Sequence, residues 1–344
     1  MKIVRLFTLM LFSFLMLNSC LQFDTLLTTA RNYDETNQTC LVSSDDGYLY
    51  RSYAIRGATT LGASKIEKVN INTGVATTIL GSGNLNVTDG IGLAAEFKQI
   101  TALAFIPGSP QKLLVGDYCT LREVNLSTLQ VTTKAGASGN CASDTNGTGT
   151  AARFTSVRGL VVSGTTLLVA TSNQIKQVSL STYTVSSYIG SSTAGDTDGV
   201  GTGASITPLN MTKLGNIIYL MDSAKKIKKI SLNDLSVTTI VGQTISGTTY
   251  NSQDGVGTNA TLLFSNMNAL SSDNNNYLYF TESQKIRRLN LTTYQVTTIL
   301  NSYGQDEDID STDLGLARIF RPSGLVFTNQ GLFVSTLYGI RRLK

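Results

Sequence analysis

The chain has 344 residues, of which 27 are Lys or Arg and 23 are Asp or Glu, and it contains no histidine. A net charge of +4 is not typical of a nucleic-acid-binding protein. The absence of histidine excludes a Ser-His-Asp or Cys-His nucleophile and a zinc site with histidine ligands.

Residues 1–19 have the features of a secretory signal peptide. Lys2 and Arg5 precede an apolar run over 6–17, and the small Ser19 stands before a candidate cleavage point. The run is too short for a membrane-spanning helix, which needs roughly 20 residues. With Lys2 and Arg5 removed, 25 basic and 23 acidic residues remain, a net charge of +2.

The segment Leu17-Asn18-Ser19-Cys20 resembles the lipobox of bacterial lipoproteins. The resemblance implies that Cys20 is acylated and becomes the first residue of the mature protein. We therefore expect the chain in the bacterial cell envelope, on the outer membrane and either periplasmic or surface-exposed, with a lipid anchor as its only membrane attachment. The alternative is cleavage by an ordinary signal peptidase, which would leave Cys20 as a thiol.

After the leader, the chain repeats a pair of short β-branched runs with a period of roughly 50–60 residues. The first run of each pair reads like Lys-Ile-Lys-Lys-Ile-Ser-Leu, and the second like Val-Thr-Thr. The pairs begin at 65, 120, 174, 226 and 285 for the first run, and at 75, 131, 185, 237 and 296 for the second. Self-similarity at this period indicates a propeller with one blade per repeat.

Two further strand-like runs precede each pair, so each repeat supplies four strands, which we name a to d. We predict an all-β fold, a single six-bladed β-propeller over 20–344 with four antiparallel strands per blade. The sixth strand c, at 339–344, ends the chain without a strand d. We expect the segment 23–30, within a tether and closing strand over 20–38, to complete that blade from the other end of the chain.

Each strand a is preceded by an Asp-Gly-x-Gly-x-x-Ala-x-Phe element. Copies begin at Asp89, Asn146, Asp198 and Asp254, and a degraded copy begins at Asp313. Together with the strands that follow, this element resembles the NHL-repeat family, over nearly the whole mature chain. The resemblance implies a β-propeller. In blade one we expect a long loop between strands b and c, from Arg51 to Ser64.

Strands alternate in direction, so the b–c turns lie on the same side of the disc as the connections from strand d to the next strand a. We call this side the loop face. Cys119 lies in a b–c turn and Cys141 follows strand d of the same blade, so we predict a disulfide between them. We expect Cys40 to be a small buried hydrophobic residue.

Basic residues gather at the starts of the strands c, and we predict that those of blades four to six bind an acidic partner. The partner would be a protein or an anionic glycan. The candidates are Lys225, Lys226, Lys228, Lys229, Lys285, Arg287, Arg288, Arg341 and Arg342. The alternative is that these side chains lie on solvated edges and pair with the loop aspartates Asp89, Asp144, Asp198, Asp254 and the run 306–313.

The function predicted is that of a lipid-anchored binding scaffold, monomeric, that uses one face and needs no cofactor or metal. The alternating carboxylates at 196–198 and 306–310 allow a calcium site, but an Asp before Gly more often begins a turn. The alternative function is a metal-dependent hydrolase or lyase with its site in the central channel. That alternative requires three or more carboxylates that converge on the axis.

Overall fold

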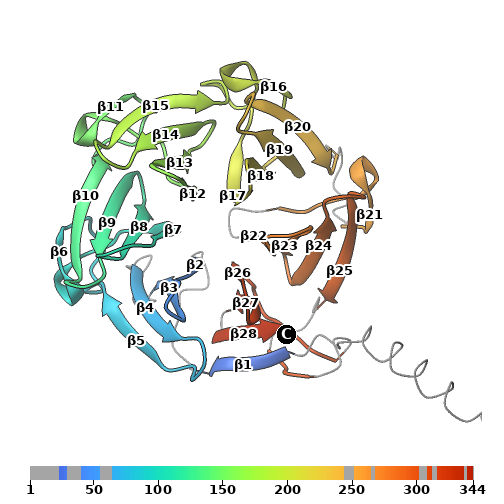
Figure 1. Ribbon diagram of the computed structural model, residues 1–344, viewed down its shortest axis with the longest axis horizontal. Helices are drawn as coiled ribbons and strands as arrows, with labels where there is room; N and C mark the ends of the chain where they lie inside the picture. Colours follow the sequence, from blue (N-terminus) through green and yellow to red (C-terminus); the bar gives the residue numbers. More distant parts are fainter. Residues whose placement is uncertain are drawn as a thin grey trace, which may run out of the picture.

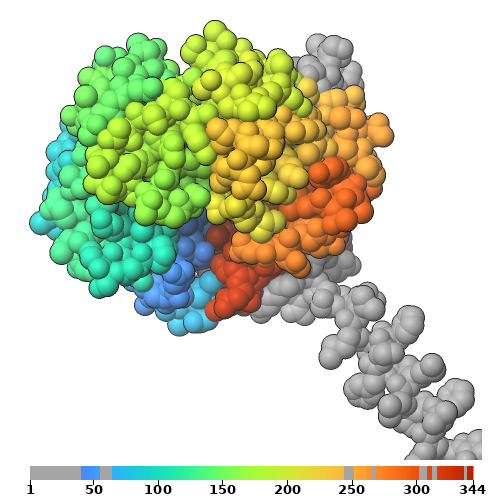
Figure 2. All heavy atoms as spheres, turned by 45° about the horizontal axis from the view of Figure 1, so that its top comes forward, coloured from blue at the N-terminus to red at the C-terminus, as the bar shows by residue number. Residues whose placement is uncertain are grey.

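The computed structural model is a ring of six antiparallel sheets around a central axis (Figure 1). It describes residues 23–28, 40–54, 64–243, 252–264, 268–301, 308–311, 316–336 and 339–343. The all-β, six-bladed propeller is confirmed. Figure 2 shows neighbouring blades in contact with one another around the ring. No helix within the described ranges is long and apolar enough to cross a membrane.

The blades follow one another along the chain, with strand a nearest the axis. Blade 1 consists of β2 (Leu41–Ser43), β3 (Tyr48–Ala54), β4 (Ser64–Asn70) and β5 (Ala76–Leu80). Blade 2 consists of β7 (Ile100–Ile106), β8 (Lys112–Asp117), β9 (Thr120–Asn125) and β10 (Gln130–Gly136). Blade 3 consists of β12 (Gly159–Ser163), β13 (Thr166–Ala170), β14 (Ile175–Ser179) and β15 (Thr184–Ile189).

The second half of the ring repeats this plan. Blade 4 consists of β17 (Pro208–Leu214), β18 (Ile217–Asp222), β19 (Lys226–Ser231) and β20 (Ser236–Val241). Blade 5 consists of β22 (Leu270–Ser272), β23 (Tyr277–Glu282), β24 (Lys285–Asn290) and β25 (Gln295–Asn301). Blade 6 consists of β26 (Gly324–Thr328), β27 (Gly331–Ser335), β28 (Gly339–Leu343) and β1 (Phe23–Thr28).

The N-terminal strand closes the ring. β1 pairs antiparallel with β28, with Phe23 opposite Leu343 and Thr28 opposite Gly339. The blue β1 and the red β28 therefore lie side by side in Figure 1, although they come from opposite ends of the chain. This pairing covers an edge that would otherwise expose unpaired backbone groups.

The element before each strand a adds a short fifth strand to blades 2–5, which the expectation of four strands per blade missed. β6 (Gly90–Ile91), β11 (Gly147–Thr148), β16 (Gly199–Val200) and β21 (Gly255–Val256) each pair with strand d. A single 3₁₀ turn follows each of them: η1 (Gly92–Ala94), η2 (Gly149–Ala151), η3 (Gly201–Gly203) and η4 (Gly257–Asn259). The second glycine of the element has a positive φ, 56° at Gly92 and 53° at Gly201, a conformation that costs glycine little.

The aromatic or aliphatic residue that ends this element joins neighbouring blades. Phe154 is fully buried and packs in one cluster with Leu121 of blade 2 and Val169 of blade 3. Phe97 occupies the same place between blades 1 and 2. The repeated Ala-x-Phe thus supplies part of the hydrophobic contact that holds the ring together.

Two boundaries predicted from the sequence were wrong. Arg51 does not begin a loop, because β3 continues to Ala54 and the Arg51 side chain is buried beside Glu67. The degraded fifth copy of the element aligns on Asp310 rather than Asp313. The β-bridge Ile309↔Arg318 is equivalent to the β-bridge Thr88↔Glu96. Ile309 directly precedes Asp310, as Thr88 directly precedes Asp89.

Candidate functional site

A buried cation occupies the same position of strand c in blades 2–6. These residues are Arg122, Lys176, Lys228, Arg287 and Arg341, and each is at most 5% exposed. Each donates a hydrogen bond to the first residue of the loop element in its own blade: Asp89, Asn146, Asp198, Asp254 and Asp310, respectively. The loop element and strand c, more than 25 residues apart, are therefore joined by one charged contact.

Strand d adds a threonine to this contact in blades 2, 4 and 5, and a serine, Ser187, in blade 3. Asp198 accepts hydrogen bonds from the backbone N–H and the hydroxyl of Thr239, at 2.7 and 2.9 Å. Thr133 bonds Asp89 and Thr298 bonds Asp254 in the same way. The repeated Val-Thr-Thr of strand d thus supplies the threonine that orients the loop carboxylate.

In blades 2, 4, 5 and 6 a second carboxylate contacts the buried cation, and it comes from the end of strand b or from the loop. In blades 2 and 5 it lies at the end of strand b, where Asp117 contacts Arg122 at 3.1 Å and Glu282 contacts Arg287 at 2.7 Å. In blade 6 that position is Thr336, and the carboxylate comes from the loop as Asp308, 3.3 Å from Arg341. Either site places a negative group beside the cation and offsets its desolvation, and blade 4 has both, Asp222 at the end of strand b and Asp196 in the loop.

Blade 1 reverses the charges of this arrangement. Glu67 stands at the equivalent position of strand c, and its carboxylate lies 2.7 Å from the Arg51 guanidinium of strand b. Both side chains are buried.

The nine basic residues predicted to bind a partner fall into three groups of three. Lys228, Arg287 and Arg341 are the buried cations, so their charge is neutralised inside the blades and is not available to a partner, a correction to the prediction. Lys229, Arg288 and Arg342 lie partly exposed along strand c, each opposite Tyr219, Tyr279 or Phe333 of strand b. Lys225, Lys226 and Lys285 lie partly exposed at the b–c turns, on the loop face.

The three lysines of the b–c turns contact the loops around them. The Lys225 ammonium donates to the backbone carbonyl of Phe264, and Lys226 forms an ion pair with Asp196. Lys285 donates to the Ser252 hydroxyl at 2.7 Å. The predicted pairing with loop aspartates therefore holds for Lys226 and for the buried cations, although the latter are not on solvated edges.

The carboxylates at 196–198 and 308–310 have cations as partners. Lys228 contacts Asp198 at 2.8 Å and Asp196 at 2.9 Å, and Arg341 contacts Asp310 at 2.8 Å. Within the described ranges, no group of three or more His, Cys, Asp or Glu residues is arranged to hold a metal ion. Asp306 lies outside those ranges.

The charged contacts predict a pH dependence of stability. Burial acts to raise the pKa of Asp89, Asp198 and Asp254, but hydrogen bonds from the strand d threonine and the buried cation outweigh it, so each pKa lies below the usual 3.8. A lowered carboxyl pKa contributes stability that is fully present above 3.8 and is lost as the pH falls through the folded-state value.

We therefore expect the triple variant D89N/D198N/D254N to unfold at a lower temperature than the wild type at pH 7. The difference should shrink as the pH falls below about 4, where the wild-type carboxylates also become protonated. Thermal unfolding followed by circular dichroism between pH 7 and pH 2.5 measures this convergence. A difference in unfolding temperature that stays constant from pH 7 to pH 2.5 would contradict the stabilising role of these three carboxylates.

The structure contains a disulfide between Cys119 and Cys141, with Cα atoms 5.7 Å apart, on the loop face of blade 2. Cys40 is buried, and burial raises the pKa of its thiol to about 12, with a smaller opposing effect from its hydrogen bond with Ser52. Cys20 lies outside the described residues.

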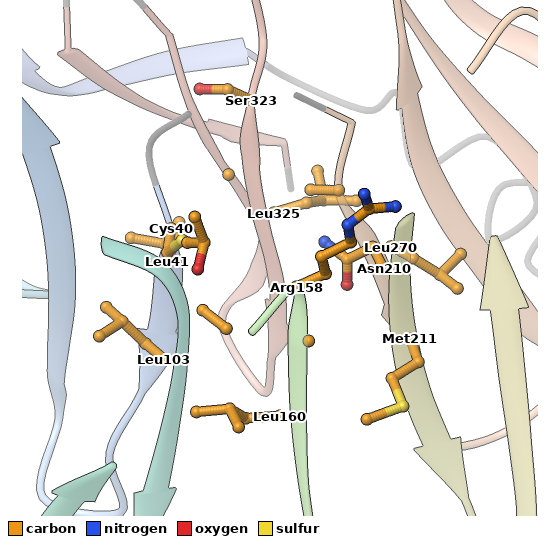
Figure 3. Close-up of a pocket in the computed structure, with 15 residues that line it drawn as sticks. Cys40, Leu41, Leu103, Arg158, Leu160, Asn210, Met211, Leu270, Ser323 and Leu325 are labelled. Atoms are coloured by element: carbon orange, nitrogen blue, oxygen red, sulfur yellow. The ribbon is translucent and has the colours of Figure 1, made fainter. Parts of the chain in front are cut away.

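An axial cavity of about 90 Å³ lies where the strands a begin, at the loop-face end of the channel (Figure 3). All six blades contribute to its lining, through residues such as Leu41, Leu103, Asn210, Leu270 and Leu325. Arg158 is the single charged residue among the described residues that line it, and none of these is Asp, Glu or Tyr. Sequence reasoning missed this residue, because nothing in the repeat pattern marks which side chain faces the axis.

No protein-family model matches the chain, and no curated protein matches it in sequence. Its fold is similar to that of an auxiliary nutrient binding protein from Bacteroides thetaiotaomicron, with 13% identity and a TM-score of 0.62, over 94% of this chain and 76% of that one. An auxiliary nutrient binding protein from Bacteroides ovatus gives 12% identity and a TM-score of 0.64 over the same shares.

A third similar structure is the extracellular domain of a hybrid two component system from B. thetaiotaomicron. It has 15% identity and a TM-score of 0.53, over 94% of this chain and 42% of that one. At these identities the likeness is one of fold, and it places the chain among six-bladed propellers.

Proposed function

We propose that the protein is a lipid-anchored propeller of the bacterial cell envelope, of NHL type, that binds a partner through its loop face. Acyl chains on Cys20 form the anchor, and the protein works as a monomeric, non-enzymatic scaffold. The propellers of similar fold that are named as nutrient binding proteins or as an extracellular domain support this proposal, as does the leader sequence.

The direction of β1 is the observation that carries the proposal. Because Phe23 lies opposite Leu343, at the end of β28, the first residue of β1 is on the face of the c–d turns, opposite the loop face. Cys20 is three residues before Phe23, so at most about 10 Å of extended chain separates them. A lipid on Cys20 would hold the c–d turn face against the membrane and leave the loop face free.

The lysines of the b–c turns are the residues through which we propose that the loop face attracts an acidic partner. Lys225, Lys226 and Lys285 belong to adjacent blades 4 and 5 and remain partly exposed. Positive charge gathered on one face raises the association rate with an anionic surface and fixes its orientation.

The experiment is capture of envelope components on the immobilised protein. At low salt, we expect the variant K225Q/K226Q/K285Q to retain less than a fifth of the acidic protein or anionic glycan that the wild type captures. At high salt the difference between variant and wild type should shrink, because salt screens the exposed lysines. The matched control is K229Q/R288Q/R342Q, which removes the same charge from the middle of the strands. Equal losses in both variants, or no loss in either, would reject the loop face as the binding surface.

The channel-centred hydrolase or lyase lacks the residues it requires at the axial cavity. The described lining carries one arginine and no carboxylate, whereas calcium or magnesium needs several oxygen ligands. No observation on the described residues favours this alternative.

A further inference from the structure

Arg158 breaks the near-symmetry of the axial cavity. It directly precedes β12, the strand a of blade 3, and its side chain lies in the middle of the lining residues beside Asn210 (Figure 3). The described residues that the other five blades contribute to the lining are all neutral. A single charge in a neutral ring of repeats is not needed for the fold, because those blades form the same strand without it.

The positive charge of Arg158 has no ion-pair partner among the described residues. Within those residues, its guanidinium makes one hydrogen bond, to the backbone carbonyl of Pro208 at 3.0 Å. The nearby Asp144 carboxylate is engaged elsewhere, by the backbone N–H of Thr155 at 2.8 Å and the hydroxyl of Thr171 at 2.7 Å. Most of the five N–H donors of the guanidinium are therefore left for the cavity.

The buried cations of the blades provide the comparison. Arg122 and Arg287 each contact two carboxylates of the chain, and Arg341 does the same. Arg158 is partly buried as well, and burial lowers the pKa of its guanidinium while the charge of Asp144 acts in the opposite direction. A partly buried cation that has no ion-pair partner among the described residues is stabilised by an anion that contacts it.

We propose that the axial cavity binds a small oxyanion, a carboxylate or a phosphate, whose charge is met by the Arg158 guanidinium. The planar fork of arginine matches both groups with two parallel hydrogen bonds. Since one water needs roughly 10–15 Å³, a cavity of about 90 Å³ has room for such an anion with a few waters.

Each strand a is the edge strand of its sheet next to the axis, so its outer N–H groups take no part in the ladder of their own sheet. One of them, that of Phe327, donates to the Ser271 hydroxyl of the neighbouring β22. The apolar side chains of Leu41, Leu103 and Leu270 also line the space and lower the local dielectric, which strengthens the charged contact. The site does not depend on the lipid anchor or on a partner at the loop face.

The test is isothermal titration of the purified wild-type protein with sodium acetate and, separately, with inorganic phosphate, at constant ionic strength. We expect saturable binding of at least one anion with a stoichiometry of one. Binding of acetate alone identifies a carboxylate site, and binding of phosphate alone identifies a phosphate site. The variant R158Q should bind at least tenfold more weakly, and R158K, which keeps the charge without the fork, should fall between the two.

The matched control is R153Q, which removes an arginine of the same blade whose guanidinium contacts the carbonyls of Thr150 and Ala152, outside the cavity. It should bind the anion as the wild type does, and so should K225Q/K226Q/K285Q, which separates this site from the proposed partner surface. Thermal unfolding confirms that R158Q and R158K are folded. Binding of neither anion by the wild type, or equal binding by wild type and R158Q, would overturn the proposal.

Discussion

Replacing Arg287 by leucine is expected to lower the free energy of unfolding by about 3–5 kcal/mol. The Arg287 guanidinium is fully buried and contacts Glu282 at 2.7 Å and Asp254 at 3.0 Å. It also donates to the backbone carbonyls of Gln253 and Thr261. Leucine would leave the equally buried Glu282 without its cation, while the two carbonyls would keep only the hydrogen bonds that they accept from each other's backbone N–H groups.

The neighbouring Arg288 provides the control. It is partly exposed, and its guanidinium lies over the Tyr277 ring at 4.6 Å, so Arg288→Leu should cost less than about 1 kcal/mol. Urea unfolding of the two variants measures the difference. Replacing Glu282 together with Arg287, as E282M/R287M, should recover part of the loss because no uncompensated charge then remains at that position. Similar costs for Arg287→Leu and Arg288→Leu would show that the buried contact does not stabilise the blade.

The blades could be predicted because each is encoded by a local pattern. Alternating β-branched residues and a repeat of roughly 50–60 residues give strands a to d directly, and the missing last strand points to 23–30 as its replacement. β1 covers Phe23–Thr28 of that segment. The end of a strand could not be predicted where a charged residue is buried in an ion pair. Arg51 has the charge typical of a loop residue, but its side chain is buried against Glu67.

The sequence shows the charged residues that form these contacts, but it does not show directly which of them are buried. Lys228 and Arg287 were counted with Lys229 and Arg288 as one basic surface, although alternate residues of a strand point to opposite sides. One signal could have separated them. In blades 2 and 5 a carboxylate ends strand b, as Asp117 or Glu282, in blades 3 and 6 a threonine follows strand b and the carboxylate stands in the loop, and blade 4 has both Asp222 and Asp196.

The axial arginine shows the limit of repeat-based prediction. Arg158 lies within a run that reads correctly as the beginning of a strand a, yet the sequence does not reveal that its side chain enters the channel. Only the closure of all six blades around one axis brings it beside Asn210 and into one lining with Leu270 and Leu325.

In the proposed arrangement the anchored face and the binding face are opposite sides of the disc. A label at each end of β24 can separate them, because Ser283 lies in the b–c turn, Thr292 lies in the c–d turn, and both are exposed. The six residues of β24 hold the two sites about 20 Å apart. Cys40 should not be labelled, since it is buried and burial raises its pKa to about 12.

The most direct measurement is therefore quenching of a thiol-linked fluorophore on S283C or T292C by a quencher carried on lipid headgroups, with the proteins in membranes. We predict strong quenching for T292C and weak quenching for S283C, and no quenching for either when Cys20 is replaced by alanine. Stronger quenching at S283C, or equal quenching at both positions, would contradict the claim that the loop face points away from the membrane.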